Sequence, residues 1–220
     1  MFIGHFAVAF ASKKASPGTS LGTLFLAAQF IDLLWPTLLL LGIERVAIKT
    51  GGYHGPPLAF THYPVSHSLL AVAGWAVLLA AVHYAARRDR RAAAVIAAAV
   101  LSHWFLDFIV HEPDLPLAPG AAPKLGLGLW WWPTLSLAFE LCVFAAGLWL
   151  YVRATRAVDR TGTWALWALV AFLLAIHLAN SFGPPPPSVE AVAWTGHAQW
   201  LLVLWGYWLD RHRTAWQARR

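Results

Sequence analysis

Six stretches of the chain are each about as long and as apolar as a helix that crosses a lipid bilayer, which takes about 20 mainly apolar residues. The windows are 21–42, 66–86, 92–111, 134–152, 163–181 and 189–209. Arginine-rich or proline- and glycine-rich stretches separate them. In lipid, the backbone polar groups must be satisfied within the protein, and a helix does this within its own segment. The sequence therefore predicts an all-α fold, a polytopic membrane helix bundle with about six transmembrane helices.

The composition of the 220 residues favours the same class. Hydrophobic residues make up 59% of the chain and charged residues only 12%, whereas soluble domains are about half apolar and about a quarter charged. The net charge of +6 indicates loops that face a cytoplasmic membrane surface, and we expect no nucleic-acid partner. Because Cys142 is the single cysteine, an intrachain disulfide is excluded.

The first apolar run, residues 2–11, is too short to span a bilayer. We expect it to form a short re-entrant or interfacial helix. It does not resemble a signal peptide, because Lys13 and Lys14 follow the apolar run instead of preceding it. The whole chain is interpreted as a single integral membrane domain, with an outer loop or lid at 112–133 and a basic cytoplasmic tail at 211–220.

Basic residues lie in alternate connections between the apolar windows. These residues are Lys13, Lys14, Arg87, Arg88, Arg90, Arg91, Arg153, Arg156, Arg160, Arg211, Arg213, Arg219 and Arg220. Cytoplasmic loops carry an excess of Lys and Arg in membrane proteins. We therefore expect a multi-pass protein with both termini in the cytoplasm.

The stretch LSHWFLDFIVHEPDLP, residues 101–116, carries ionisable side chains inside an apolar window. His103, Asp107 and His111 are spaced four residues apart, so on a helix they follow one face and rise about 6 Å per step. A charged side chain at the centre of a membrane helix costs about 2.5–3.5 kcal/mol. Histidine and carboxylate ligands at this spacing suit a divalent metal, whose charge would offset that cost. The alternative is a hydrogen-bonded seam between helices, with neutral histidines.

Further ionisable side chains lie in or beside the other apolar segments. His5 lies in the short first segment, Asp32 in the middle of the first window and Glu140 in the fourth. Lipid cannot satisfy such groups, so we expect them to face the bundle interior. Glu140 is the candidate general base or additional ligand, and Asp32 is a second candidate catalytic carboxylate. His62 and His67 lie where an outer loop meets the second window, and act either as ligands or as interfacial histidines without a ligand role.

Four short motifs occur in an order that is typical of one family: GH at 4–5, an aspartate at 32, H-x4-HSLL at 62–70 and SH-x3-D at 102–107. Over about residues 1–115 the chain resembles the YdjM-like family of predicted inner-membrane, metal-dependent hydrolases, some of them regulated by LexA. The chain departs from the family pattern where Tyr63 stands in place of a frequent arginine. The resemblance implies metal-binding roles for His5, Asp32, His62, His67, His103 and Asp107.

These observations predict a hydrolase in a bacterial-type inner (plasma) membrane, with its site in the outer half. One to three divalent ions, with zinc as the first choice, would activate water for attack on a phosphoester or other ester of a lipid or lipid-linked substrate. One alternative is a non-catalytic metal or proton carrier, or a membrane scaffold with a structural metal. Another is a metal-independent lipid-phosphate phosphatase that uses a phosphohistidine, since SHS at 66–68 and SHWFLD at 102–107 echo its motifs. The sequence makes no prediction of the oligomeric state.

Overall fold

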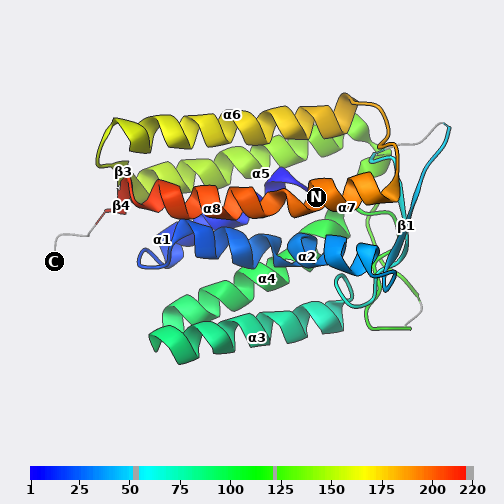
Figure 1. Ribbon diagram of the computed structural model, residues 1–220, viewed down its shortest axis with the longest axis horizontal. Helices are drawn as coiled ribbons and strands as arrows, with labels where there is room; N and C mark the ends of the chain where they lie inside the picture. The colour runs from blue at the N-terminus through cyan, green and yellow to red at the C-terminus, as the bar shows by residue number, and fades with distance from the viewer. Residues whose placement is uncertain (52–54, 121–122, 217–220) are drawn as a thin grey trace.

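The protein is an all-α helix bundle in a computed structural model that describes residues 1–51, 55–120 and 123–216. Its helices are α1 (Ile3–Ala15), α2 (Leu21–Leu40), α3 (Leu69–Arg87), α4 (Arg90–Val110), α5 (Pro133–Ala154), α6 (Arg160–Phe182), α7 (Val189–His197) and α8 (Gln199–Asp210), with a short 3-10 turn η1 (Leu129–Trp131). The long helices run side by side along the long axis (Figure 1). The predicted fold class is confirmed. Residues 121–122 of the expected outer loop and 217–220 of the expected tail lie outside the described residues.

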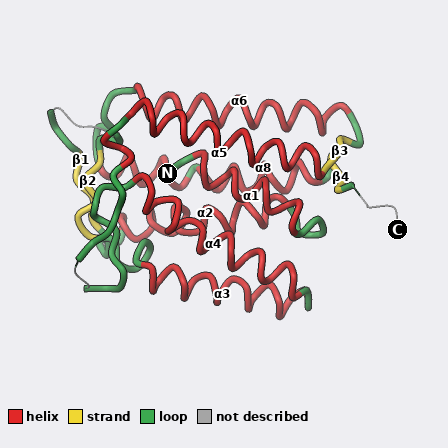
Figure 2. The backbone as a smooth tube through the Cα atoms, turned by 180° about the vertical axis from the view of Figure 1, so that it is seen from behind, coloured by secondary structure: helices red, strands yellow, loops and turns green. Residues whose placement is uncertain are grey.

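Two small antiparallel sheets mark the two ends of the bundle (Figure 2). Strands β1 (Arg45–Ile48) and β2 (Leu58–His62) pair at one end, which we call the hairpin end. Strands β3 (Thr155–Ala157) and β4 (Arg213–Ala215) pair at the other, which we call the basic end. The basic end also holds the tight α3–α4 connection, where Arg88 closes α3 with a left-handed backbone (φ 56°).

Five helices of the described chain, α2 to α6, are long and apolar enough to cross a membrane. Their outward faces carry large apolar side chains: Val77 is 69% exposed, Trp164 74% and Phe182 74%. Soluble proteins seldom expose apolar surface on this scale. In a bilayer, lipid tails would cover these faces and keep the apolar side chains away from water. The helices therefore indicate a membrane protein.

The sixth expected span, 189–209, is not one continuous helix. Helices α7 and α8, of 9 and 12 residues, meet at Ala198 and follow one another in line (Figure 1). The break lies beside a tight contact between Gly196 and Pro36 of α2, where a Cβ on residue 196 would overlap the proline ring. The sixth window is therefore two short helices that pack along α2.

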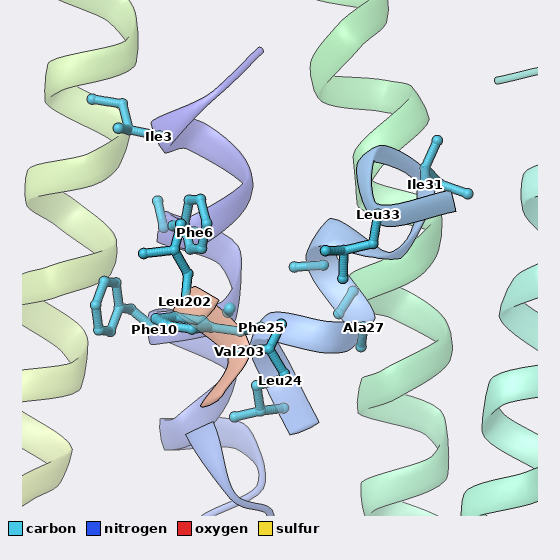
Figure 3. Close-up of a cluster of buried hydrophobic side chains, with 14 of the residues drawn as sticks. Ile3, Phe6, Phe10, Leu24, Phe25, Ala27, Ile31, Leu33, Leu202 and Val203 are labelled. Carbon is cyan, nitrogen blue, oxygen red and sulfur yellow. The ribbon is translucent and has the colours of Figure 1, made fainter. Parts of the chain in front are cut away.

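The first segment forms α1, and α1 lies inside the bundle. Ile3, Phe6 and Phe10 are at most 1% exposed. Figure 3 shows Phe6 and Phe10 of α1 in one buried cluster with Phe25 of α2, and their ring centroids lie 5.0 and 5.2 Å from that of Phe25. On another side, α1 approaches Gly147 of α5 so closely that a Cβ there would overlap the α1 backbone. The interfacial alternative is therefore wrong, because α1 is buried among other helices and runs from the middle of the bundle to its basic end (Figure 1). The re-entrant alternative stays a prediction.

Candidate metal centre

Asp107 lies at the centre of a buried cluster of histidines, near the hairpin end of α4. Its Oδ1 lies 3.2 Å from Nε2 of His5 and 3.9 Å from Nε2 of His111. Its Oδ2 lies 3.2 Å from Nε2 of His103 and 3.9 Å from Nε2 of His67. Four imidazole nitrogens thus surround one carboxylate, two beside each oxygen.

Asp32 of α2 adds a second carboxylate on the Oδ2 side of the cluster. Its Oδ1 lies 3.6 Å from Nε2 of His67 and 3.6 Å from Nε2 of His103. The ligand atoms of Asp32, His67 and His103, and separately those of His5, His103 and Asp107, lie within 4.8 Å of one another. The Asp32 side chain is 22% exposed and that of Asp107 only 2%, so Asp32 reaches the surface.

The distances within the cluster distinguish hydrogen bonds from metal ligands. An N–H···O hydrogen bond spans about 2.7–3.2 Å, whereas two atoms that are both about 2.0–2.1 Å from a tetrahedral zinc ion lie about 3.3–3.4 Å apart. Four of the six nitrogen–oxygen separations are 3.6–3.9 Å, and the other two are 3.2 Å. Four of the six pairs are therefore too long to be hydrogen bonds, and each would have to close by about 0.2–0.6 Å to become an edge of a tetrahedral zinc site.

His103 presents an unprotonated nitrogen to the carboxylates when its ring is neutral. Its Nδ1 donates a hydrogen bond to the backbone carbonyl of Ala28 at 2.9 Å. A carbonyl oxygen only accepts, so the proton is on Nδ1 and the lone pair is on Nε2, which faces Asp107 and Asp32. A lone pair that faces carboxylate oxygens is unfavourable unless a cation lies between them. Metal-binding histidines almost always donate their other ring N–H in this way.

A buried chain of hydrogen bonds, which we call the relay, fixes His67 in the same tautomer as His103, with the proton on Nδ1. Glu44 is 1% exposed and accepts hydrogen bonds from the backbone N–H groups of Val65 and Ser66 at 2.7 and 2.8 Å. The Ser66 hydroxyl donates to Glu44 at 2.5 Å, so it accepts from Nδ1 of His67 at 2.7 Å. The Nε2 lone pair of His67 therefore points toward Asp32 and Asp107.

His111, which ends α4 as its C-cap, is held by the outer loop. Its Nδ1 donates to Asp114 Oδ1 at 3.0 Å, and the hydroxyl of Tyr63 donates to the same oxygen at 2.7 Å. Burial and the charge of Asp114 raise the pKa of Tyr63, so this hydroxyl keeps its proton. The Trp130 ring covers the imidazole at a centroid distance of 4.1 Å. His111 thus also turns Nε2 toward Asp107.

His5 is buried and stacks on His103, with ring centroids 3.6 Å apart and planes 6° apart. Two protonated rings at this distance would repel each other strongly in a buried site. Neither ring nitrogen of His5 has a hydrogen-bond partner among the described residues. A buried polar atom without a partner is costly, by about 1–3 kcal/mol. A metal ion would satisfy it.

The α-amino group of Met1 and the side chain of Glu140 lie next to the cluster. The amine lies 2.6 Å from Asp107 Oδ1, where it balances part of the buried negative charge. Glu140 accepts the Phe2 N–H at 3.0 Å and lies 3.9 Å from Nδ1 of His177. Its carboxylate therefore lies at the start of α1, where a negative charge is favourable. The described residues do not bring Glu140 into either group of possible ligands.

His62 does not join the cluster. It ends strand β2 opposite Arg45 and is exposed. The next residue, Tyr63, takes the buried position, with its ring centroid 5.1 Å from that of His67. The expectation that the loop brings His62 and His67 together is therefore wrong. His62 is the exposed last residue of β2, and Tyr63, which follows the strand, is buried.

The described residues of the outer loop 112–133 are fastened over the hairpin end. Leu115 and Leu125 exchange backbone hydrogen bonds, and Gly128 N–H donates to the carbonyl of His111. Leu69, at the start of α3, donates to the carbonyl of Pro116. The loop thus covers the cluster and supplies Asp114. A role as a lid stays a prediction.

Sequence reasoning did not identify the residues that hold the ligands. Glu44 and Ser66 lie 22 residues apart, and Tyr63 and Asp114 lie 51 apart. Only Asp114 had a local signal, since it follows His111 by three residues in HEPD. The other contacts arise from tertiary packing.

Comparison with known proteins does not add to this geometry. A scan of protein-family models and searches of curated proteins and of solved structures found no match to the chain. The resemblance to the YdjM-like family therefore depends on the four motifs alone. Any function has to be inferred from the cluster itself.

Proposed function

We propose that the protein is a membrane-embedded, metal-dependent hydrolase whose divalent ion is held by Asp32, His67, His103 and Asp107. The proposal depends above all on one observation. His103 and His67 each donate Nδ1–H to a protein acceptor and turn Nε2 toward two carboxylates. Nitrogen and oxygen ligands without thiolate suit zinc in a tetrahedral site.

The exposure of Asp32 supports a catalytic ion over a structural one. Structural zinc sites are closed, whereas catalytic sites keep a position open for water or substrate. His67, His103 and Asp107 are at most 4% exposed, but the Asp32 side chain is 22% exposed. Water and substrate would therefore enter beside Asp32.

An ion at this site would supply Lewis acidity and lower the pKa of water toward about 7. The residues of the chain supply the rest of the chemistry. Asp32 would be the exchangeable ligand: it is the one ligand of this ion whose side chain reaches the surface, so it is placed to give up its position to incoming water and to accept the proton of that water. Glu140, the other candidate base, is engaged by Phe2 N–H, so its proposed part is to position α1 and His5.

The surroundings of the site favour a substrate carried by the membrane. Asp32 lies in the middle of α2, a helix apolar enough to span, and the neighbouring helices present apolar faces. We propose a phosphoester or other ester of a lipid or lipid-linked molecule. With the basic end in the cytoplasm of a bacterial-type cell, the cluster would lie in the outer half of the plasma membrane.

The test is metal content and hydrolysis by the full chain, purified in lipid nanodiscs. The probes are bis-(p-nitrophenyl) phosphate, p-nitrophenyl butyrate and phosphatidic acid. We expect stoichiometric metal, and hydrolysis of at least one probe that a chelator abolishes and zinc restores. Absence of stoichiometric metal would contradict the proposal.

Two other outcomes point to the alternative functions. Bound metal without hydrolysis, together with metal uptake into sealed vesicles, would favour a carrier. Hydrolysis that survives the chelator and is abolished by His67→Ala would favour a phosphohistidine phosphatase. Either result would overturn the hydrolase mechanism proposed for this cluster.

A further inference from the structure

We infer that the centre holds two divalent ions, one on each oxygen of Asp107, so that this carboxylate bridges them. The inference rests on the proposed function and deepens it. It assigns His5 and His111, which the first ion does not use, to a second metal site.

The number of donor groups exceeds what one ion can take. A tetrahedral ion has four ligands. Six buried or half-buried side chains converge here, four through an imidazole Nε2 and two through a carboxylate. They are His5, Asp32, His67, His103, Asp107 and His111. Because an imidazole nitrogen offers one lone pair, each histidine serves one ion.

The donors divide according to the Asp107 oxygen that they face. His103 and His67 lie 3.2 and 3.9 Å from Oδ2, and Asp32 lies 3.6 Å from both rings. His5 and His111 lie 3.2 and 3.9 Å from Oδ1. The Oδ1 side therefore offers three protein ligands, the number that is usual at a zinc site with an open position. His5 already lies within 4.8 Å of the ligand atoms of His103 and Asp107, and His111 would have to move closer to His5 to complete the set.

Two further observations favour a cation on the Oδ1 side. Nε2 of His5, the nitrogen that faces Oδ1, is buried and lacks a hydrogen-bond partner among the described residues, so this side contains a metal-binding nitrogen that a cation would satisfy. The Met1 ammonium already lies 2.6 Å from Oδ1, so the site accepts a positive charge. A metal ion and the ammonium would compete for this oxygen.

The test is the number of ions per chain in metal-free protein reloaded with Mn(II) or Zn(II) and then desalted. We expect about two ions in the wild type, about one in His111→Ala or His5→Ala, about one in Asp32→Asn, and almost none in Asp107→Ala. Manganese-loaded wild type should give the electron paramagnetic resonance spectrum of a coupled pair, and His111→Ala that of an isolated ion. His62→Ala, an exposed histidine outside the cluster, is the matched control and should keep both ions.

The outcomes separate this inference from the proposed function. One ion in the wild type, unchanged in His5→Ala and His111→Ala, would overturn the second site and leave the hydrolase proposal standing. No ion in the wild type would overturn both. If His5→Ala does not fold by circular dichroism, His111→Ala decides the question, because His111 lies beyond the last turn of α4.

Discussion

Histidine–aspartate pairs occur in two regions of this protein, and their geometry differs. At the basic end, Nδ1 of His212 lies 2.7 Å from Asp159, and both side chains are partly exposed. In the buried cluster, the imidazole nitrogens lie 3.2–3.9 Å from Asp107 and Asp32. The exposed pair has closed to hydrogen-bond length, and most of the buried contacts have not.

The difference follows from what holds each side chain. His212 and Asp159 are free to approach each other on the surface. Three of the four cluster histidines, His103, His67 and His111, are anchored through Nδ1 to Ala28, Ser66 and Asp114, so their Nε2 atoms stay at a fixed distance from the carboxylates. Most of these buried distances between Nε2 and carboxylate oxygen atoms are too long for a shared proton in a hydrogen bond, and they leave room for a metal ion. This spacing is the observation that supports the proposed metal ion.

Asp107→Asn should have the largest effect, because this residue touches every part of the cluster. The amide keeps the volume and removes the charge that both oxygens carry. We expect metal binding to weaken by more than the roughly 10–100-fold that is typical when an outer partner of a ligand is lost, and chelator-sensitive hydrolysis to disappear. Isothermal titration with Zn(II) measures the affinity. Unchanged affinity would mean that the wide spacing of the buried pairs has another cause.

Ser66→Ala should have the next largest effect, because it disconnects His67 from Glu44. We expect metal affinity to fall by about 10–100-fold, as for loss of other outer partners. The matched control is Ser68→Ala, two residues away, whose hydroxyl caps α3. That change should cost about 1 kcal/mol of stability and leave affinity unaltered. Equal effects of the two variants on affinity would show that the relay does not orient His67.

Gly147→Ala tests whether the position of α1 matters to the cluster. The added methyl group would overlap the backbone of Ala7, and such overpacking costs about 1–3 kcal/mol. Because α1 carries His5, we also expect weaker metal binding. The control is Gly74→Ala in α3, where a Cβ meets no described atom within 4 Å, so stability should rise by about 0.5–1 kcal/mol. Denaturant unfolding in micelles gives both values, and a stable Gly147→Ala variant with normal affinity would contradict this packing.

Asp159→Asn should have the smallest effect, because the surface pair is screened by solvent. The hydrogen bond from His212 holds the pKa of Asp159 below its ordinary value of 3.8. The ionised carboxylate therefore stabilises the folded state above pH 3.8, and this contribution is lost as the pH falls through the lower, folded-state pKa. Asparagine keeps the cap of α6, so the small difference in Tm at pH 7 should vanish in strong acid. A change in metal content would show that the two regions are coupled.

The sequence was sufficient to predict the spanning helices, because an apolar window of about 20 residues has few other structures in lipid. It did not predict the break at Ala198, which accompanies contact between Gly196 and Pro36, 160 residues away in the chain. The sequence left the burial of α1 as one of two alternatives and did not predict its partners, since Phe25 and Gly147 lie in other helices.

The candidate site was predictable as far as local spacing determines it. The i, i+4 spacing placed His103, Asp107 and His111 on one face, and they do line the cluster. The outer partners were not predictable, because the Ala28 carbonyl that holds His103 is 75 residues away. His62 was placed wrongly because the sequence did not reveal strand β2.

Anomalous X-ray diffraction at the zinc edge, from crystals of the full chain grown with zinc, tests the central claim most directly. We predict anomalous peaks about 2.0–2.2 Å from the carboxylate oxygens of Asp107, in contact with Nε2 of His103 and His67. Crystals with no anomalous peak in the cluster, in which these histidines have closed to hydrogen-bond distance of Asp107 and Asp32, would contradict the account.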